Sequence, residues 1–183
     1  AAGADLNAKA LCFPPLITHD LLRRSDYLVN FPHLAGIVQT FPGNERDHAR
    51  LLSDLTDKKD WTEHFKSSGL ALAPAACYSI YPQLTGTLPT GGRTFEVTSY
   101  CFRHEPSDDP ARMQIFRMHE FVRLGTPTEV VAFREQWQAR SERFGRVEGY
   151  GGFPKHLPAP PLPTTRLKPR MHGQVARATK EHV

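Results

Sequence analysis

Residues 94–124 read TFEVTSYCFRHEPSDDPARMQIFRMHEFVRL, a run with two β-type ends and a polar middle. Residues 94–103 and 113–124 are rich in β-branched and aromatic side chains, which favour strands. Residues 104–112 are polar and contain two prolines, a composition that predicts a loop. We therefore expect an antiparallel pair in which residues 99–103 lie against residues 116–123.

The two strands bring a particular set of side chains to one face, because side chains two residues apart in a strand point the same way. The set comprises Cys101, Arg103 and, if the strand stays extended that far, Glu105 from the first strand, and Arg112, Phe116 and Glu120 from the second. Guanidinium groups bind phosphate, a ring can stack on a base, and acids can hold a metal ion or an amino group. The set therefore suits a nucleotide-binding site.

Two helices are predicted on either side of this unit. Asn44 can cap a surface helix that runs toward Trp61, with leucines at helical spacing. Residues 126–129, TPTE, form a capping box with proline at the first helical position. This box predicts a helix from Pro127 to about Phe144.

The N-terminal part of the chain carries weaker patterns. Residues 1–43 contain three Phe-Pro steps, which predict short extended pieces and turns. Residues 70–76 predict a buried strand that runs into Cys77.

Charge and proline divide the chain near residue 150. The chain has a formal charge of +4, but residues 151–183 hold six Lys or Arg and one acid, which leaves residues 1–150 close to −1. Six prolines fall between residues 154 and 169. We expect a domain over residues 1–150 and a Pro-rich basic tail over 151–183, either foreign to the fold or a polyproline linker. The domain has no basic bias that favours tRNA or DNA.

Cysteine usage and hydropathy point to a reduced compartment. The three cysteines, Cys12, Cys77 and Cys101, are widely spaced, and no apolar run reaches the length of a membrane helix. We expect a cytoplasmic protein without a membrane segment. The first methionine is Met113, so we expect a processed N-terminus or a fragment.

Five positions at fixed spacing resemble motif 2 of the class II aminoacyl-tRNA synthetases: Arg103, Glu105, Arg112, Phe116 and Glu120. A wider stretch of sequence resembles the amino acid:[carrier protein] ligases, which are homologues of the catalytic core of atypical seryl-tRNA synthetases. It consists of residues 74–82, PAACYSIYP, and residues 98–127. The resemblance runs from about Phe13 to Phe144. It implies an α+β fold, a class II synthetase-like antiparallel sheet flanked by helices.

The resemblance implies roles for four residues of the set. Arg103 would grip the α-phosphate of ATP, and Arg112 would reach the outer phosphates. Phe116 would stack on adenine. Glu105 would orient adenine or the arginine, so that Arg103 and Glu105 are the expected catalytic pair and all four are expected to bind ATP.

The same resemblance implies a zinc ion held by two cysteines and a glutamate, with an open position for the amino group of the substrate. Cys77 and Glu120 match the first two ligands. No cysteine follows Cys101, and no glycine-rich motif 3 with its second ATP-binding arginine is present in the 183 residues. We therefore expect a C-terminally incomplete domain that holds zinc weakly or not at all.

The reaction implied by the resemblance is adenylation of a small amino acid, glycine or alanine, with ATP and Mg²⁺. The aminoacyl group would pass to the phosphopantetheine thiol of a carrier protein, in a fold that forms homodimers. Two alternatives stay open, tRNA aminoacylation of the seryl-tRNA synthetase type and a non-catalytic remnant. Because motif 3 and a zinc ligand are missing, we expect little or no activity from this chain.

Overall fold

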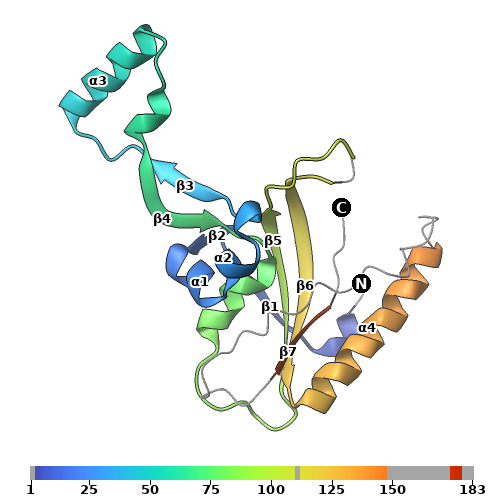
Figure 1. Cartoon of the computed structure of the whole chain (residues 1–183). Coiled ribbons are helices and arrows are strands. Elements are labelled where there is room, and N and C mark those ends of the chain that lie inside the picture. Colours follow the sequence, from blue (N-terminus) through green and yellow to red (C-terminus); the bar gives the residue numbers. More distant parts are fainter. Residues whose placement is uncertain (1–2, 110–111, 148–173, 179–183) are drawn as a thin grey trace.

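The structure, a computed structural model, describes residues 3–109, 112–147 and 174–178. Two sheets and several helices are visible in Figure 1, with the strand pair predicted from residues 94–124 at the centre. Among the described residues, no helix has both the length and the apolar character that crossing a membrane requires.

The larger sheet has the strand order β1-β5-β6-β7. Its strands are β1 (Lys9–Cys12), β5 (Arg93–Phe102), β6 (Ile115–Gly125) and β7 (Gln174–Ala178). β1 runs parallel to β5, and the other neighbours are antiparallel. The predicted antiparallel pairing of the two β-type segments is confirmed over ten consecutive residues of β5. Its register differs from the expected ranges, because residues 99–101 pair with 116–118 and residues 119–123 pair with 94–98.

Side-chain alternation gives this sheet two different faces. Cys101 pairs with Phe116 and Val97 with Glu120, so these four buried side chains share one face. That face packs against the 3-10 helix η4 (Ala76–Gln83), which contacts both β5 and β6.

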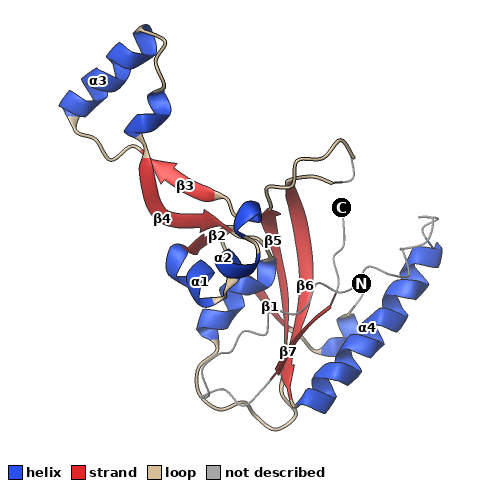
Figure 2. Cartoon of the chain, viewed as in Figure 1, coloured by secondary structure: helices blue, strands red, loops and turns tan. Residues whose placement is uncertain are grey.

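The helix α4 (Pro127–Val147) covers the other face, as the blue helix beside β6 and β7 in Figure 2 shows. Phe121 of β6 stacks on Trp137 of α4 with ring centroids 4.8 Å apart, and Phe133 completes this small core. The predicted helix after the capping box is confirmed.

The smaller sheet has the order β2-β4-β3, all antiparallel. It consists of β2 (Leu16–Thr18), β4 (Lys66–Leu72) and β3 (Ile37–Thr40). β3 and β4 lead into an arm formed by α3 (Glu45–Thr56) and the 3-10 helix η3 (Trp61–His64), which extends away from the rest of the chain in Figure 1. The helix predicted after Asn44 is α3, and Asn44 caps it with a complete capping box.

Short helices fill the remaining N-terminal segment. They are η1 (Ala4–Leu6), α1 (His19–Arg24), α2 (Tyr27–Asn30) and η2 (Pro32–Leu34). The extended pieces expected over residues 1–43 are present as β1, β2 and β3, and the four short helices are elements that the sequence did not reveal. Leu22 and Tyr27 are buried in the main core, and this packing stabilises helices too short to persist alone.

One further prediction needs correction, and another falls largely outside the described residues. The strand expected over residues 70–76 ends at Leu72, because Pro74 cannot donate a ladder hydrogen bond, and Cys77 lies in η4 instead. Of the predicted tail, only β7 belongs to the described residues, where it pairs with β6. The division of the chain at residue 150 stays a prediction. The expected α+β fold with antiparallel sheets flanked by helices is confirmed.

Candidate functional site

Arg103 stands at the point where β5 becomes the loop. Its backbone N–H donates to the carbonyl of Gln114 at 2.9 Å, so the strand pair continues one residue beyond β5. Its Nε donates to the carbonyl of Pro74 at 3.0 Å, which ties the half-buried side chain to the segment before η4. No local sequence pattern predicts this anchor, because Pro74 lies 29 residues from Arg103 along the chain.

The guanidinium of Arg103 also lies over the ring of Phe116. The distance from Cζ to the ring centroid is 5.4 Å, within the range of a cation–π contact. Phe116 is buried, and its strand partner is Cys101. The structure thus brings together two residues of the predicted nucleotide set, one from each strand.

The terminal nitrogens of Arg103 have a different environment from Nε. Among the described residues, neither Nη1 nor Nη2 has a hydrogen-bond acceptor or an acidic partner. A guanidinium that is fixed through Nε and has two remaining donor groups is suited to bind a phosphate in a forked geometry.

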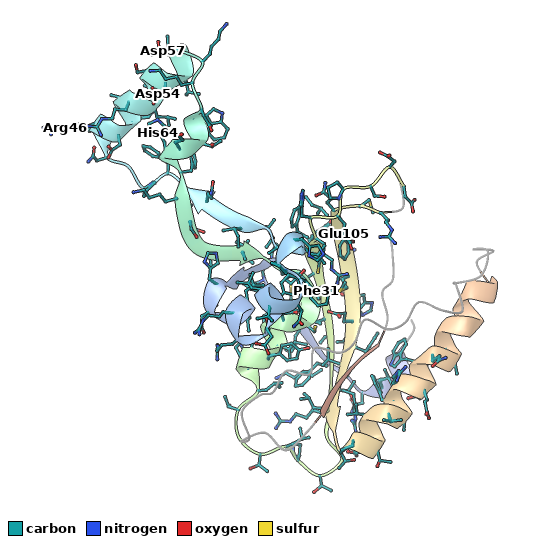
Figure 3. All side chains as sticks on the ribbon, in the orientation of Figure 1. Phe31, Arg46, Asp54, Asp57, His64 and Glu105 are labelled. Carbon is teal, nitrogen blue, oxygen red and sulfur yellow. The ribbon has the colours of Figure 1, made fainter. Side chains whose placement is uncertain are left out.

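Glu105 and Arg112 lie in the loop and not on the strand faces where the alternation placed them. β5 ends at Phe102 and β6 begins at Ile115, so neither residue continues the ladder. The N–H of Glu105 bonds to the carbonyl of Arg103 at 2.8 Å, which bends the chain away from the sheet. Arg112 is exposed. Figure 3 shows Glu105 where the loop leaves β5.

Cys77 and Glu120, the two predicted zinc ligands, meet in the buried face of the sheet. The N–H of Cys77 donates to Oε2 of Glu120 at 2.7 Å, and the hydroxyl of Tyr81 donates to Sγ of Cys77 at 3.4 Å. Cys77 is fully buried and Glu120 is 5% exposed.

These donors fit a zinc ion only in part. Within the described ranges, no group of three His, Cys, Asp or Glu side chains is placed to hold a metal ion. A catalytic zinc uses three protein ligands, and Cys77 and Glu120 supply two. Cys101, the other buried cysteine, directs its thiol to the carbonyl of Ser99 at 3.8 Å.

The surface near Arg103 is distinct from a hollow at the other end of β5. That hollow is lined by Lys9, Gly91, Gly92, Arg93 and Arg123, among others. Neither Arg103 nor Phe116 lines it. The nucleotide set and the hollow are therefore separate features of the larger sheet.

Comparison with known proteins identifies the relatives of this chain. No family model matches it. It is 42% identical over 147 residues to amino acid–[acyl-carrier-protein] ligase 1 of Bradyrhizobium diazoefficiens, an alignment that covers 79% of this chain and 45% of that ligase. The chain is homologous to the amino acid–[acyl-carrier-protein] ligases.

A second ligase supports the same relationship. Amino acid–[acyl-carrier-protein] ligase 2 of the same organism is 41% identical over 145 residues, which cover 78% of this chain and 43% of the ligase. The chain thus spans less than half the length of the ligases that it matches. The resemblance seen in residues 74–82 and 98–127 is confirmed.

Solved structures show the fold of class II synthetases. The seryl-tRNA synthetase of M. kandleri, in complex with tRNASec of A. aeolicus, matches with a TM-score of 0.65 and 20% identity over 78% of this chain and 30% of that chain. Prolyl-tRNA synthetase of Giardia lamblia, in complex with prolyl-adenylate, matches with a TM-score of 0.51 and 17% identity, over 79% and 26%. At this identity the likeness concerns the fold alone.

Proposed function

We propose that this chain carries the motif 2 part of a site that activates a small amino acid with ATP for transfer to a carrier protein. The observation that carries the proposal is Arg103, whose Nε is bonded to Pro74 while its terminal nitrogens lack a partner among the described residues. The homology to two ligases named for amino acids and an acyl-carrier protein supports the choice of substrates.

The proposed reaction has two balanced steps. A carboxylate oxygen of the amino acid attacks the α-phosphorus of ATP, and the bond to the bridging oxygen breaks, so that pyrophosphate leaves and an aminoacyl adenylate forms. The phosphopantetheine thiol of the carrier then attacks the carbonyl carbon, loses its proton and releases AMP. Arg103 binds the α-phosphate and stabilises the negative charge that develops there.

The other residues of the set take supporting roles in this proposal. Arg112, exposed on the loop, reaches the outer phosphates, and Glu105, at the base of the loop, orients adenine or Arg103. Phe116 would stack on adenine, and its contact with Arg103 supports a common site for the cation and the ring. Glycine and alanine are the proposed amino acids.

Further parts of the proposal concern cofactors and assembly. Mg²⁺ accompanies ATP, and Cys77 with Glu120 would be two of the ligands of a zinc ion that binds the amino group of the substrate. No step is assigned to zinc, because the described residues supply only two donors. A homodimer and a cytoplasmic location complete the proposal.

Binding of ATP to the 183-residue chain tests the role of Arg103. A charge-assisted phosphate contact contributes about 1.5–3 kcal/mol, so Arg103→Ala should weaken Mg·ATP binding about tenfold to a hundredfold in calorimetry. Arg117→Ala is the matched control, because Arg117 is exposed on β6 and points to the opposite face from its neighbour Phe116. Equal binding by wild type and Arg103→Ala would contradict the proposal.

Amino-acid-dependent exchange between ATP and pyrophosphate tests the activation step. We expect slow exchange, because the second ATP-binding arginine of motif 3 is not among the 183 residues. Any exchange that depends on glycine or alanine should be lost in Arg103→Ala and kept in Arg117→Ala. Transfer to tRNA in place of a carrier thiol would overturn the choice of acceptor.

A further inference from the structure

Three consecutive residues at the end of β5 donate their backbone N–H groups to three separate segments. The bonds are Phe102 to Ala73 at 2.9 Å, Arg103 to Gln114 at 2.9 Å, and His104 to Leu34 at 3.1 Å. The peptide that carries Arg103 is therefore held by Gln114, directly before β6, and by two segments of the N-terminal half. Of these segments, the one that contains Leu34 belongs to no motif that the sequence revealed.

Gly36 joins this segment to the end of β4. Its carbonyl accepts the N–H of Leu72 at 2.9 Å, one residue before Ala73. The segment that begins at Leu34 and the segment that ends at Pro74 are thus bonded to each other as well as to the end of β5.

The ring of Phe102 occupies the space that a side chain at position 36 would need. A Cβ on Gly36 would lie 2.6 Å from Cδ1 and 2.7 Å from Cε1 of Phe102, and 3.0 Å from Cδ1 of Leu72. Contacts below 3.0 Å do not occur in real structures, so the ring would have to move. Gly36 does not have positive φ, so the contact with Phe102, and not the backbone conformation, is what a side chain at this position would disturb.

We propose that Gly36 is a positioning residue for Arg103. The absence of a side chain lets the Phe102 ring lie against the backbone at position 36. This contact determines the position of the peptide bond between Phe102 and Arg103. The hydrogen bond from Nε to Pro74 then holds the guanidinium at a defined height above Phe116. This inference rests on the proposed function of Arg103 in binding ATP.

A methyl group at position 36 should therefore act on ATP binding through Arg103. Displacement of Phe102 moves the adjacent peptide, and a charge-assisted hydrogen bond to phosphate weakens when its donor leaves the preferred distance and angle. We expect Gly36→Ala to bind Mg·ATP at least about tenfold more weakly than wild type. Phe102→Leu in the Gly36→Ala background removes the ring atoms that meet the new methyl group and should restore binding to the level of Phe102→Leu alone.

Gly125→Ala is the matched steric control. A Cβ at Gly125 would lie 2.7 Å from Oε2 of Glu129, so this variant also introduces a close contact into the larger sheet. Gly125 is the last residue of β6, at the end of the strand pair remote from Arg103. We expect the Gly125→Ala variant to be less stable than wild type and to bind ATP with wild-type affinity.

The test is a double-mutant cycle between positions 36 and 103, measured by calorimetric ATP binding. Weakening by Gly36→Ala that disappears in the Arg103→Ala background, and that Phe102→Leu relieves, supports the inference. Additive effects, or wild-type binding by folded Gly36→Ala, overturn it and leave the role of Arg103 intact. Should Gly36→Ala fail to fold, the folded double variant Gly36→Ala/Phe102→Leu is compared with Phe102→Leu alone, and equal ATP binding supports the inference while weaker binding by the double variant overturns it. If Arg103→Ala itself binds like wild type, the proposed function fails and this inference fails with it.

Discussion

The backbone N–H of Cys77 donates a 2.7 Å hydrogen bond to Oε2 of Glu120, across 43 residues of sequence. Cys77 lies in the first turn of η4, where N–H groups lack partners within the helix and favour a negative charge. Glu120 therefore holds η4 against β6 as well as being a candidate metal ligand. The fold and the proposed site share these two residues.

Replacement of Glu120 should measure its structural role. In Glu120→Ala, the N–H of Cys77 loses its acceptor in a buried place, and the free energy of unfolding should fall by about 1–3 kcal/mol. Glu120→Gln keeps an oxygen acceptor on a side chain of the same size, so its free energy of unfolding should fall less than that of Glu120→Ala. Urea unfolding of the three proteins measures the difference, and equal stability of wild type and Glu120→Ala would show that the bond contributes little.

Zinc should be present at well below one ion per chain after a chelator wash. Two donors, Cys77 and Glu120, are one fewer than the set that a catalytic zinc site uses, and no cysteine follows Cys101. Elemental analysis of the washed protein measures the content. Stoichiometric zinc that Cys77→Ser abolishes would reveal a third ligand outside the described residues.

The charge of Arg103 should not be sufficient for ATP binding. Lysine lacks the forked guanidinium, so Arg103→Lys cannot bond Pro74 through Nε and present two further donors to a phosphate. We expect Arg103→Lys to bind Mg·ATP nearly as weakly as Arg103→Ala in calorimetry. Binding at the wild-type level would mean that the charge alone acts, without the anchor to Pro74.

The elements predicted correctly are those whose sequence signals are local. α3 and α4 each begin at a capping box, at Asn44 and at Thr126, and such boxes involve residues only three apart. The strand pair was predictable because its two segments are long and flank an evident loop. Arg103 and Phe116 were assigned to one face for the same reason, and their contact confirms it.

The features that the sequence did not reveal depend on distant contacts. α1 and α2 have six and four residues and are stabilised by burial of Leu22 and Tyr27 in a core made by other elements. The anchor of Arg103 on Pro74 and the contact of Phe102 with Gly36 join segments far apart in the chain. No local pattern encodes such pairs.

The arm should loosen in acid because of Asp54. Figure 3 shows Asp54 and His64 on the arm, where the carboxylate lies 2.8 Å from Nε2 of His64 and 3.2 Å from Nζ of Lys59. The hydrogen bond with His64, and then the bond with Lys59, lower the pKa of Asp54 below its ordinary value of 3.8. A lowered pKa stabilises the arm above about pH 3.8, and this stabilisation is lost as the pH falls through the lower folded value.

Trp61 can report this change, because it begins η3 and packs edge-on against Phe65 with ring centroids 5.3 Å apart. We expect tryptophan fluorescence of the wild type to change below pH 3.8. Asp54→Asn should show the altered signal already at pH 7. An acid transition that is the same in both proteins would exclude Asp54 as its cause.

The capping box of α4 should stabilise this helix, which covers the sheet face opposite the proposed site. Oε2 of Glu129 accepts the N–H of Thr126 at 2.7 Å, and Oγ1 of Thr126 accepts the N–H of Glu129 at 3.4 Å. Thr126→Ala removes the hydroxyl of this box and should lower the free energy of unfolding by about 1 kcal/mol. Thr126→Ser keeps the hydroxyl and should retain most of the stability.

Thr128→Ala is the matched control, because Thr128 is exposed in the same helical turn and takes no part in the box. Urea unfolding followed by tryptophan fluorescence is suited to the comparison, since Trp137 of α4 is buried against Phe121 and senses the release of the helix. Thr126→Ala should unfold at lower urea than Thr128→Ala, which should match wild type. If Thr126→Ala and Thr128→Ala lose the same stability, the effect belongs to threonine in the first turn and not to the box.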